Sequence, residues 1–255
     1  MSLVLLEKQA AVATMTINRP DHHNSLDLDT SKALDAAARE IESDAAISVV
    51  ILQGAGRAFC GGGDIFAFAD HMDDLETYVR ALLEVQNRFV LRMARMPKIT
   101  IAAVHGSAAG AGLSLAAMCD MCVADEKARF VPAFAAIGLS PDSGGTFGLA
   151  RAVGTRRALR LFLAERSFSA AEAEAWGLVT KIADSGRVAD EARKLAEDIA
   201  AKGPDAVSNT KRLMGRLDNG VLEDQLHHEL ESIVRCMKKE SFRHAVNAFT
   251  RKGAD

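Results

Sequence analysis

One acidic side chain, Asp142, stands in the stretch AAIGLSPDSGGT, between a proline and a Ser-Gly-Gly run. A carboxylate in such a loop can do chemistry, because it can take up and release a proton. The local composition favours a plainer role, since Pro presets φ, Asp caps helices and Gly relieves strain in turns. The stretch by itself therefore predicts a turn and leaves proton transfer as the alternative.

Two further stretches, LQGAGRAFCGGGD and VHGSAAGAGLSLAA, place glycine-rich turns after predicted strands. Gly and Ala leave the backbone N–H groups unobstructed, so two such turns can direct two N–H groups at one ligand atom. A pair of this kind is an oxyanion hole, which stabilises negative charge that develops on a carbonyl oxygen. A helix beginning near Ala111 would add the positive end of its dipole.

Neither turn completes a familiar cofactor or nucleophile motif. The first lacks the third glycine of a dinucleotide fingerprint, where Phe59 stands, and GGGD is not followed by the Lys-Ser/Thr of a P-loop. The second approaches G-x-S-x-G at Ser114, but the later histidines His227, His228 and His244 lie inside a helical pattern. We interpret Ser114 as a residue of a helix rather than as a nucleophile.

The four cysteines do not form a metal or disulfide pattern. Cys119 and Cys122 make one C-x-x-C, and Cys60 and Cys236 supply no second pair. We expect all four to behave as small buried hydrophobic residues.

The 255 residues are 49% hydrophobic, enough for a substantial core in one large domain or one domain with a helical appendage. A net charge of −3 gives no electrostatic case for nucleic acid or an anionic membrane as a partner. The start, MSLVLLEKQAAV, lacks a basic region, and no apolar run reaches membrane-spanning length. We expect a soluble, cytoplasmic protein.

The candidate residues depend on a framework of strands and helices that hydrophobic periodicity predicts. Up to about residue 150, buried strands alternate with helices, which favours an α/β fold with a parallel sheet, and the last hundred residues look almost wholly helical. We therefore expect a core over 1–195 and a helical region over 196–255. The predicted strands include 3–18 (a hairpin), 47–56 and 98–106, and the predicted helices include 25–44, 74–95, 155–163, 169–175, 188–201 and 205–217.

Several short motifs follow one another along essentially the whole chain: TINRPDHHNSL, GAGRAFCGGGDI, PKITIAAVHGSAAGAG, LAAMCDMCVADEKARF, IGLSPDSGGT, LARAVG and SAAEAEAWGLV. In their order and spacing the chain resembles the enoyl-CoA hydratase/isomerase, or crotonase, superfamily. The resemblance implies a spiral of ββα units with a C-terminal helical trimerisation region, and a homotrimer or dimer of trimers. It also implies a coenzyme A thioester as substrate, with no cofactor and no metal.

Carried over by motif, the resemblance places the two oxyanion N–H groups at Gly63 and Ala111. It also implies a set of residues along the substrate: His22, His23, Ser25, Gly61, Gly62, Asp64, Ile65, Gly110, Ser114, Phe134 and Pro141.

The chain departs from typical hydratases at the two positions where these carry glutamate, which are Ser114 and Phe134 here. Hydration calls for one group to activate water and another to handle the α-proton, and neither residue is a competent base. The AAGAG and IGLSPDSGGT motifs resemble a narrower branch, the ring-epoxide isomerase of phenylacetyl-CoA breakdown and the Δ3,Δ2-enoyl-CoA isomerases. In that branch the aspartate at the position of Asp142 is the acid/base.

The resulting prediction is an enoyl-CoA isomerase in which Asp142 carries a proton between two carbons. Burial beside apolar neighbours such as Phe134 would raise the pKa of Asp142. An enoyl-CoA hydratase of fatty-acid or aromatic-acid degradation is the alternative activity, and a non-catalytic acyl-CoA binding protein is the alternative of a different class. A dehalogenase with a nucleophilic aspartate is disfavoured, because only 5% of the residues are aromatic.

Overall fold

A sheet of six strands organises the part of the chain that the computed structural model describes, residues 2–216 and 221–252. The first pair of strands is the antiparallel hairpin predicted from the sequence, and every later pair is parallel. In spatial order the strands are β1 (Val4–Gln9), β2 (Val12–Ile17), β3 (Val49–Gly54), β4 (Ile99–Val104), β6 (Met121–Asp125) and β9 (Lys181–Ala183).

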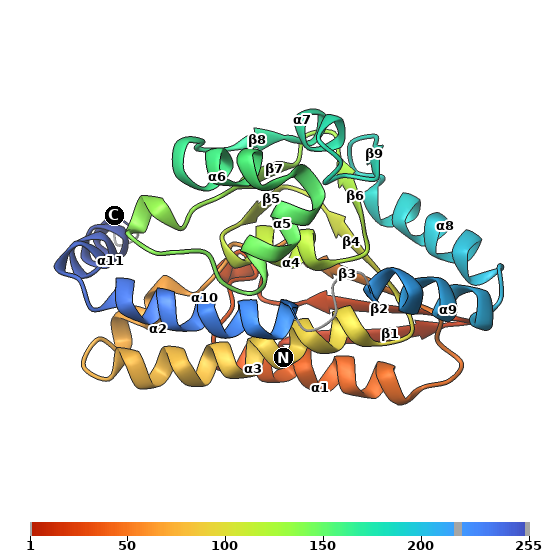
Figure 1. Ribbon diagram of the computed structural model, residues 1–255, viewed down its shortest axis with the longest axis horizontal. Helices are drawn as coiled ribbons and strands as arrows, with labels where there is room; N and C mark the ends of the chain where they lie inside the picture. The colour runs from red at the N-terminus through yellow and green to blue at the C-terminus, as the bar shows by residue number, and fades with distance from the viewer. Residues whose placement is uncertain (1, 217–220, 253–255) are drawn as a thin grey trace.

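Helices cover both faces of this sheet, because the strand residues that point to one face and those that point to the other are both apolar. On β3, Val50 and Leu52 join the core beneath α1 (Leu28–Ser43) and α3 (Leu75–Arg95), whereas Val49 and Ile51 join the core beneath α8 (Val188–Ala200). Figure 1 shows α1 and α3 together on one side of the sheet.

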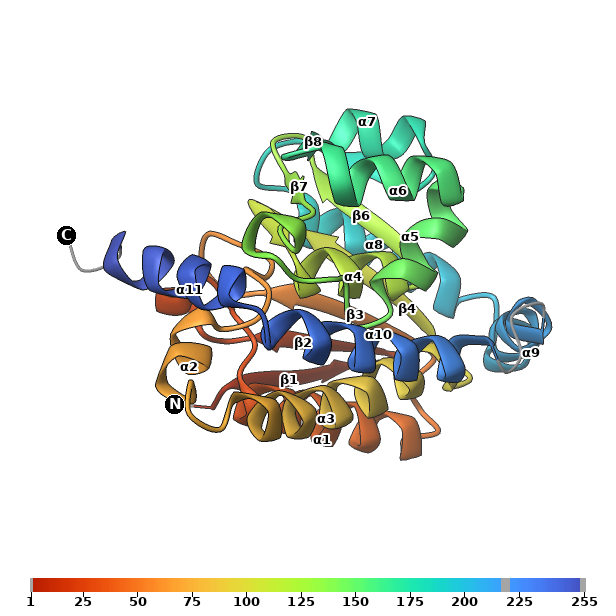
Figure 2. The same cartoon turned by 60° about the vertical axis from the view of Figure 1, so that its left-hand side comes forward.

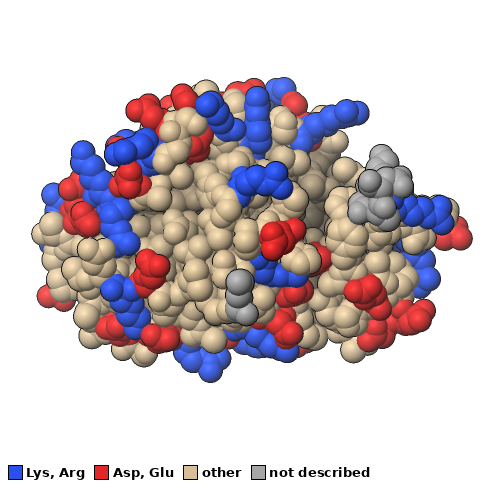
Figure 3. Space-filling model, turned by 180° about the vertical axis from the view of Figure 1, so that it is seen from behind, with Lys and Arg blue, Asp and Glu red and all other residues tan. Residues whose placement is uncertain are grey.

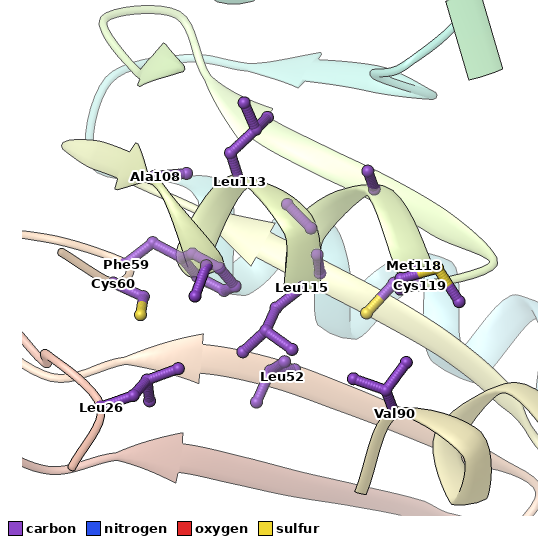
Figure 4. Close-up of a cluster of buried hydrophobic side chains, with 14 of the residues drawn as sticks. Leu26, Leu52, Phe59, Cys60, Val90, Ala108, Leu113, Leu115, Met118 and Cys119 are labelled. Atoms are coloured by element: carbon purple, nitrogen blue, oxygen red, sulfur yellow. The ribbon is translucent and has the colours of Figure 1, made fainter. Parts of the chain in front are cut away.

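A short helix at the centre of the molecule, α4 (Ala111–Met118), is buried at every residue. Its Gly, Ala and Leu side chains allow this, and Leu115 lies over Leu52 of β3 (Figure 4). The helix follows β5 (Ser107–Ala109), which pairs with β7 (Arg129–Val131) in a second sheet completed by β8 (Phe168–Ser169). The N-terminus of α4 is therefore held by the second sheet and enters the core from there.

The C-terminal helices return to the first half of the chain. Figures 1 and 2 show α10 (Val221–Met237) lying along α3 and α11 (Glu240–Lys252) reaching α2 (Ile65–Asp70), and contacts between these pairs agree. The remaining helices are α5 (Gly145–Val153), α6 (Thr155–Ala164), α7 (Ala170–Ala175) and α9 (Pro204–Gly215), with 3-10 turns η1 (Pro20–His22) and η2 (Ala135–Ile137).

The α/β class and the parallel arrangement predicted from the sequence are confirmed. The boundary expected between residues 195 and 196 falls within α8, which packs on the sheet as far as Ala200. Of the last hundred residues, those that the structure describes are largely helical, as predicted, and two short strands, β8 and β9, interrupt the helices.

The surface and the cysteines can be compared with the expectations from composition. Basic and acidic side chains are interspersed over the face in Figure 3. No helix in the described residues has both the length and the apolar character needed to cross a bilayer. Cys60, Cys119 and Cys122 are buried free thiols, as predicted, whereas Cys236 is only half-buried.

Candidate active site

The two glycine-rich turns meet in space, and backbone hydrogen bonds join them. The Ala109 N–H donates to the Cys60 carbonyl at 2.9 Å, and the Cys60 N–H donates to the Ser107 carbonyl at 3.2 Å. Gly62 has φ +93°, and a Cβ there would lie 2.8 Å from the Ala109 carbonyl oxygen. Only glycine allows this approach, because any side chain would force the two turns apart.

Two N–H groups at this junction are free to bind a ligand. Gly63 and Ala111 both line the pocket described below, and within the described residues neither N–H donates a hydrogen bond to the protein. Ala111 is the first residue of the buried helix α4, so its N–H lies at the positive end of the helix dipole. The turns can thus present two donors to one anionic oxygen.

These donors line a pocket of about 510 Å³. Its apolar walls come from four separate segments and include Phe66, Phe68, Phe134, Leu139 and Phe249. The Phe249 ring on α11 and the Phe66 ring on α2 form an edge-to-face contact, with ring centroids 6.0 Å apart. The C-terminal helix therefore completes a pocket whose chemistry lies in the first 142 residues.

All but two of the residues predicted for the site line this pocket. Those that do are His22, His23, Ser25, Gly61, Gly62, Gly63, Asp64, Ile65, Gly110, Ala111, Phe134 and Asp142. Ser114 and Pro141 do not. The Ser114 side chain faces α5, where a Cβ added to Gly145 would come within 2.3 Å of its Oγ. Ser114 is a packing residue between two helices in this structure, and Pro141 is half-buried beside the pocket wall.

Asp142 lies on the pocket wall with 9% of its surface exposed. Its side chain accepts a hydrogen bond of 2.9 Å from the Ser143 hydroxyl, and no ion pair joins it to a Lys or Arg of the described residues. Burial raises the pKa of Asp142 to about 7, the Ser143 hydrogen bond lowers it, and the neighbouring Glu229 carboxylate raises it. Asp142 can thus exchange a proton near neutral pH.

The loop that carries Asp142 is held by Glu229, a residue that sequence reasoning missed. Glu229, on α10 and 4% exposed, accepts hydrogen bonds from the N–H groups of Gly144 (2.8 Å) and Thr146 (2.9 Å) and from the Thr146 hydroxyl. It lies at the N-terminus of α5, where a negative charge is stabilised. Burial raises the pKa of Glu229, and the hydrogen bonds oppose that rise. No local pattern in the sequence connects residue 229 to this loop.

A second aspartate on the pocket wall, Asp64, has different partners. Its carboxylate accepts from the N–H groups of Phe66 and Ala67 as the N-cap of α2, and forms a 3.0 Å ion pair with Arg19. Arg19 also pairs with Asp27 at 3.1 Å. This carboxylate is fixed within the protein. Its cationic partner was missed in the sequence, although it stands in the NRPDHHNS motif.

The loop with the two histidines is shaped by Asn24, which was also missed. Asn24 is fully buried with φ +56°, and its Nδ2 donates to the carbonyls of Ala55 (2.8 Å) and Ala58 (2.7 Å). Its Oδ1 accepts from the Arg19 N–H at 2.9 Å. An Asn tolerates this backbone conformation, which makes an isolated Asn in a polar loop a usable signal. His22 and His23 are left exposed at the rim of the pocket.

The pocket places one group that can exchange a proton, Asp142, together with two free N–H donors, those of Gly63 and Ala111. Phe134, at one position where hydratases are expected to carry glutamate, lines the pocket and packs edge-on against Phe162 with ring centroids 6.1 Å apart. Among the described residues that line the pocket the carboxylates are Asp21, Asp64 and Asp142, and Asp142 alone is both buried and without a cationic partner. The arrangement suits proton transfer next to a thioester or other carbonyl.

Comparisons with known proteins identify the family that the chain resembles. Residues 7–255 match the family model described as enoyl-CoA hydratase/isomerase. The chain is 33% identical over 253 residues to the 1,2-epoxyphenylacetyl-CoA isomerase of Escherichia coli (strain K12), covering 99% of this chain and 97% of that protein. It is 35% identical over 250 residues to the short-chain-enoyl-CoA hydratase of Clostridium acetobutylicum, covering 98% and 95%. The crystal structure of an enoyl-CoA hydratase/isomerase from Mycobacterium paratuberculosis superposes with a TM-score of 0.90 at 27% identity, covering 97% of this chain and 98% of that one.

Proposed function

Because the chain belongs to the enoyl-CoA hydratase/isomerase family, we propose that it is an enoyl-CoA isomerase that moves a double bond by proton transfer through Asp142. The observation that carries the proposal is the state of this carboxylate, which is buried, unpaired by any cation of the described residues and shifted to a pKa of about 7. A group of this kind can act as base and then as acid at the same pH.

In the proposed reaction the thioester oxygen accepts hydrogen bonds from the N–H groups of Gly63 and Ala111. The ionised Asp142 removes a proton from the carbon next to the thioester carbonyl of a 3-enoyl-CoA. The electron pair delocalises into a dienolate whose negative charge rests on the oxygen between the two donors. Protonated Asp142 then returns the proton to the carbon two positions farther along, which leaves the 2-enoyl-CoA and regenerates the carboxylate.

The wall of the pocket supports an isomerase over a hydratase. Water addition needs a group that activates water in addition to one that handles the α-proton. Ser114 faces α5 instead of the pocket, and Phe134 offers only an apolar ring. A 1,3-proton shift needs one carboxylate alone.

The test is to incubate the protein separately with a 3-enoyl-CoA and a 2-enoyl-CoA and to follow isomerisation and hydration. We expect isomerisation, and we expect Asp142→Asn to lower kcat by about 10²–10⁴-fold. Affinity for a saturated acyl-CoA should change by less than about 10-fold. Asp29→Asn, an exposed change on α1, is the matched control and should leave both values near those of the wild type.

Two results would contradict the proposal. Hydration of the 2-enoyl-CoA faster than isomerisation would identify a hydratase, the activity that the Clostridium relative is named for. Tight binding of acyl-CoA with neither reaction would identify a binding protein.

A further inference from the structure

A second, smaller cavity of about 20 Å³ adjoins the candidate active site behind Asp142. Gly63, Phe68, Ala111 and Asp142 line both cavities, so the small one continues from the place where the proton-exchanging group meets the N–H donors. Its other walls are largely apolar and come from α3, α10 and the chain before α1: Leu26, Val79, Leu82, Leu83, Ile233 and Met237.

One wall of this small cavity carries a polar group without a partner. Gln86, on α3 and 2% exposed, accepts a hydrogen bond of 2.8 Å from the Ser31 hydroxyl at its Oε1. Its Nε2 is buried and makes no hydrogen bond within the described residues. Buried amide N–H groups are nearly always satisfied, so an unpaired one beside a cavity points to an acceptor that binds there.

The missing acceptor is small and uncharged. A cavity of about 20 Å³ holds roughly one heavy atom with its hydrogens. The nearby carboxylates of Asp142 and Glu229 and the apolar walls disfavour an anion. Ser143 already donates to Asp142 and Ser31 to Gln86, so Nε2 is the donor left over.

We propose that the preferred acyl group carries a neutral oxygen atom, as an ether, hydroxyl or carbonyl, that enters this cavity and accepts a hydrogen bond from Gln86 Nε2. The inference rests on the proposed function only in that an acyl-CoA occupies the larger pocket. With the thioester oxygen between the donors at Gly63 and Ala111, the acyl chain passes Asp142 and continues towards Gln86. Gln86 is then a specificity-determining residue.

The first experiment uses the wild-type protein and pairs of saturated acyl-CoAs that differ by one atom. Calorimetry compares hexanoyl-CoA with its 4-oxa and 5-oxa analogues, and cyclohexylacetyl-CoA with its tetrahydropyran-4-yl counterpart. We expect at least one oxygen-containing ligand to bind about 10-fold or more tightly than its carbon counterpart, because the carbon leaves a buried donor unpaired. An ordinary apolar pocket gives the opposite order, and equal or weaker binding of every oxygen analogue would overturn the proposal.

Two variants assign the preference to the amide. Gln86→Met keeps a similar volume without a donor, and should abolish the preference for oxygen or reverse it. Leu83→Met, on the same helix and the same cavity, is the control, and should move the affinities for both members of a pair in the same direction. If Gln86→Met leaves the affinity ratio of the pair unchanged, the amide contacts a water or packs only, and the proposal fails.

The design separates this inference from the proposed reaction. The ligands have no double bond, so a protein that binds oxygen analogues preferentially but isomerises nothing would retain the inference and lose the proposed function. Circular dichroism and a thermal melt check that Gln86→Met is folded. If the variant is not folded, the comparison of oxygen and carbon analogues on the wild-type protein still decides whether an oxygen atom is preferred.

Discussion

Asp64 and Asp142 lie on the wall of the same pocket, and both stand just before a helix, yet their surroundings differ. Asp64 caps α2 itself and is paired with Arg19. At the N-terminus of α5 the backbone N–H groups of Gly144 and Thr146 donate hydrogen bonds to the carboxylate of Glu229 from α10. The Asp142 side chain therefore does not cap α5, although its sequence context predicts that role.

The difference shows how one residue type serves two purposes. A carboxylate that accepts hydrogen bonds from amides and a guanidinium is held as a charge and shapes its loop. A carboxylate among apolar groups, with one hydroxyl as partner, has a pKa near neutrality and can gain and lose a proton. The loop around Asp142 keeps its shape because another residue supplies the contacts that the aspartate does not make.

The largest effect expected from this contrast is on stability in the Asp142→Asn variant. Burial raises the pKa of Asp142 from 3.8 to about 7, so the folded protein binds a proton that the unfolded chain has released between those pH values. Stability of the wild type therefore falls as pH rises from about 4 to 7, by about 4 kcal/mol at most from this group. Asp142→Asn should be more stable than wild type at pH 8, and the gain should vanish near pH 4. Urea unfolding at both pH values measures it, and a variant less stable at pH 8 would break the comparison.

The matching change at the other aspartate should act in the opposite direction. Asp64→Asn keeps a good N-cap but removes the charge that pairs with the half-buried Arg19, which retains Asp27 as a partner. We expect a loss of about 1.5–3 kcal/mol in the free energy of unfolding at pH 8. Chemical denaturation of the two variants side by side provides the check. A neutral or stabilising result would mean that Asp64 is not the fixed charge that the structure indicates.

The smallest effects concern the partners of Asp142 and the pH dependence of turnover. Catalysis needs the ionised form, so kcat/KM should rise with pH through about 7. Ser143→Ala removes a hydrogen bond that lowers the pKa of Asp142, and should move this limb to higher pH. Glu229→Gln removes a negative charge that raises the pKa, and should move it to lower pH. Each displacement should be about one pH unit or less, and movement of both variants in one direction would contradict the assigned causes.

Much of the site could be predicted from the sequence because its signals are local. Glycine at 62 and 110 reflects backbone with positive φ, and the run of Gly and Ala before Leu113 reflects a helix that enters the core. These features predict the two turns and place Asp142 in a loop, whereas the assignment of the two N–H groups to Gly63 and Ala111 comes from the motifs that resemble the crotonase superfamily. The alternation of apolar residues in the strands predicts a sheet covered on both faces.

The remaining features depend on contacts between distant segments, which no local pattern encodes. Ser114 could not be placed, because whether it faces the pocket or α5 depends on the space left by Gly145. Gln86 has the spacing of an ordinary helical residue, and only the packing of α3 against α1 leaves its Nε2 unpaired beside a cavity.

The sequence by itself determined the class of fold, the two donor turns and the presence of one aspartate between a proline and a Ser-Gly-Gly run, because backbone conformation and hydrophobic periodicity are set by neighbouring residues. Only the tertiary structure decided that this aspartate is free to exchange a proton. Its pKa depends on burial by apolar side chains and on a glutamate from α10 that accepts hydrogen bonds from the N–H groups of the loop. These groups are distant in the sequence, and only folding brings them together.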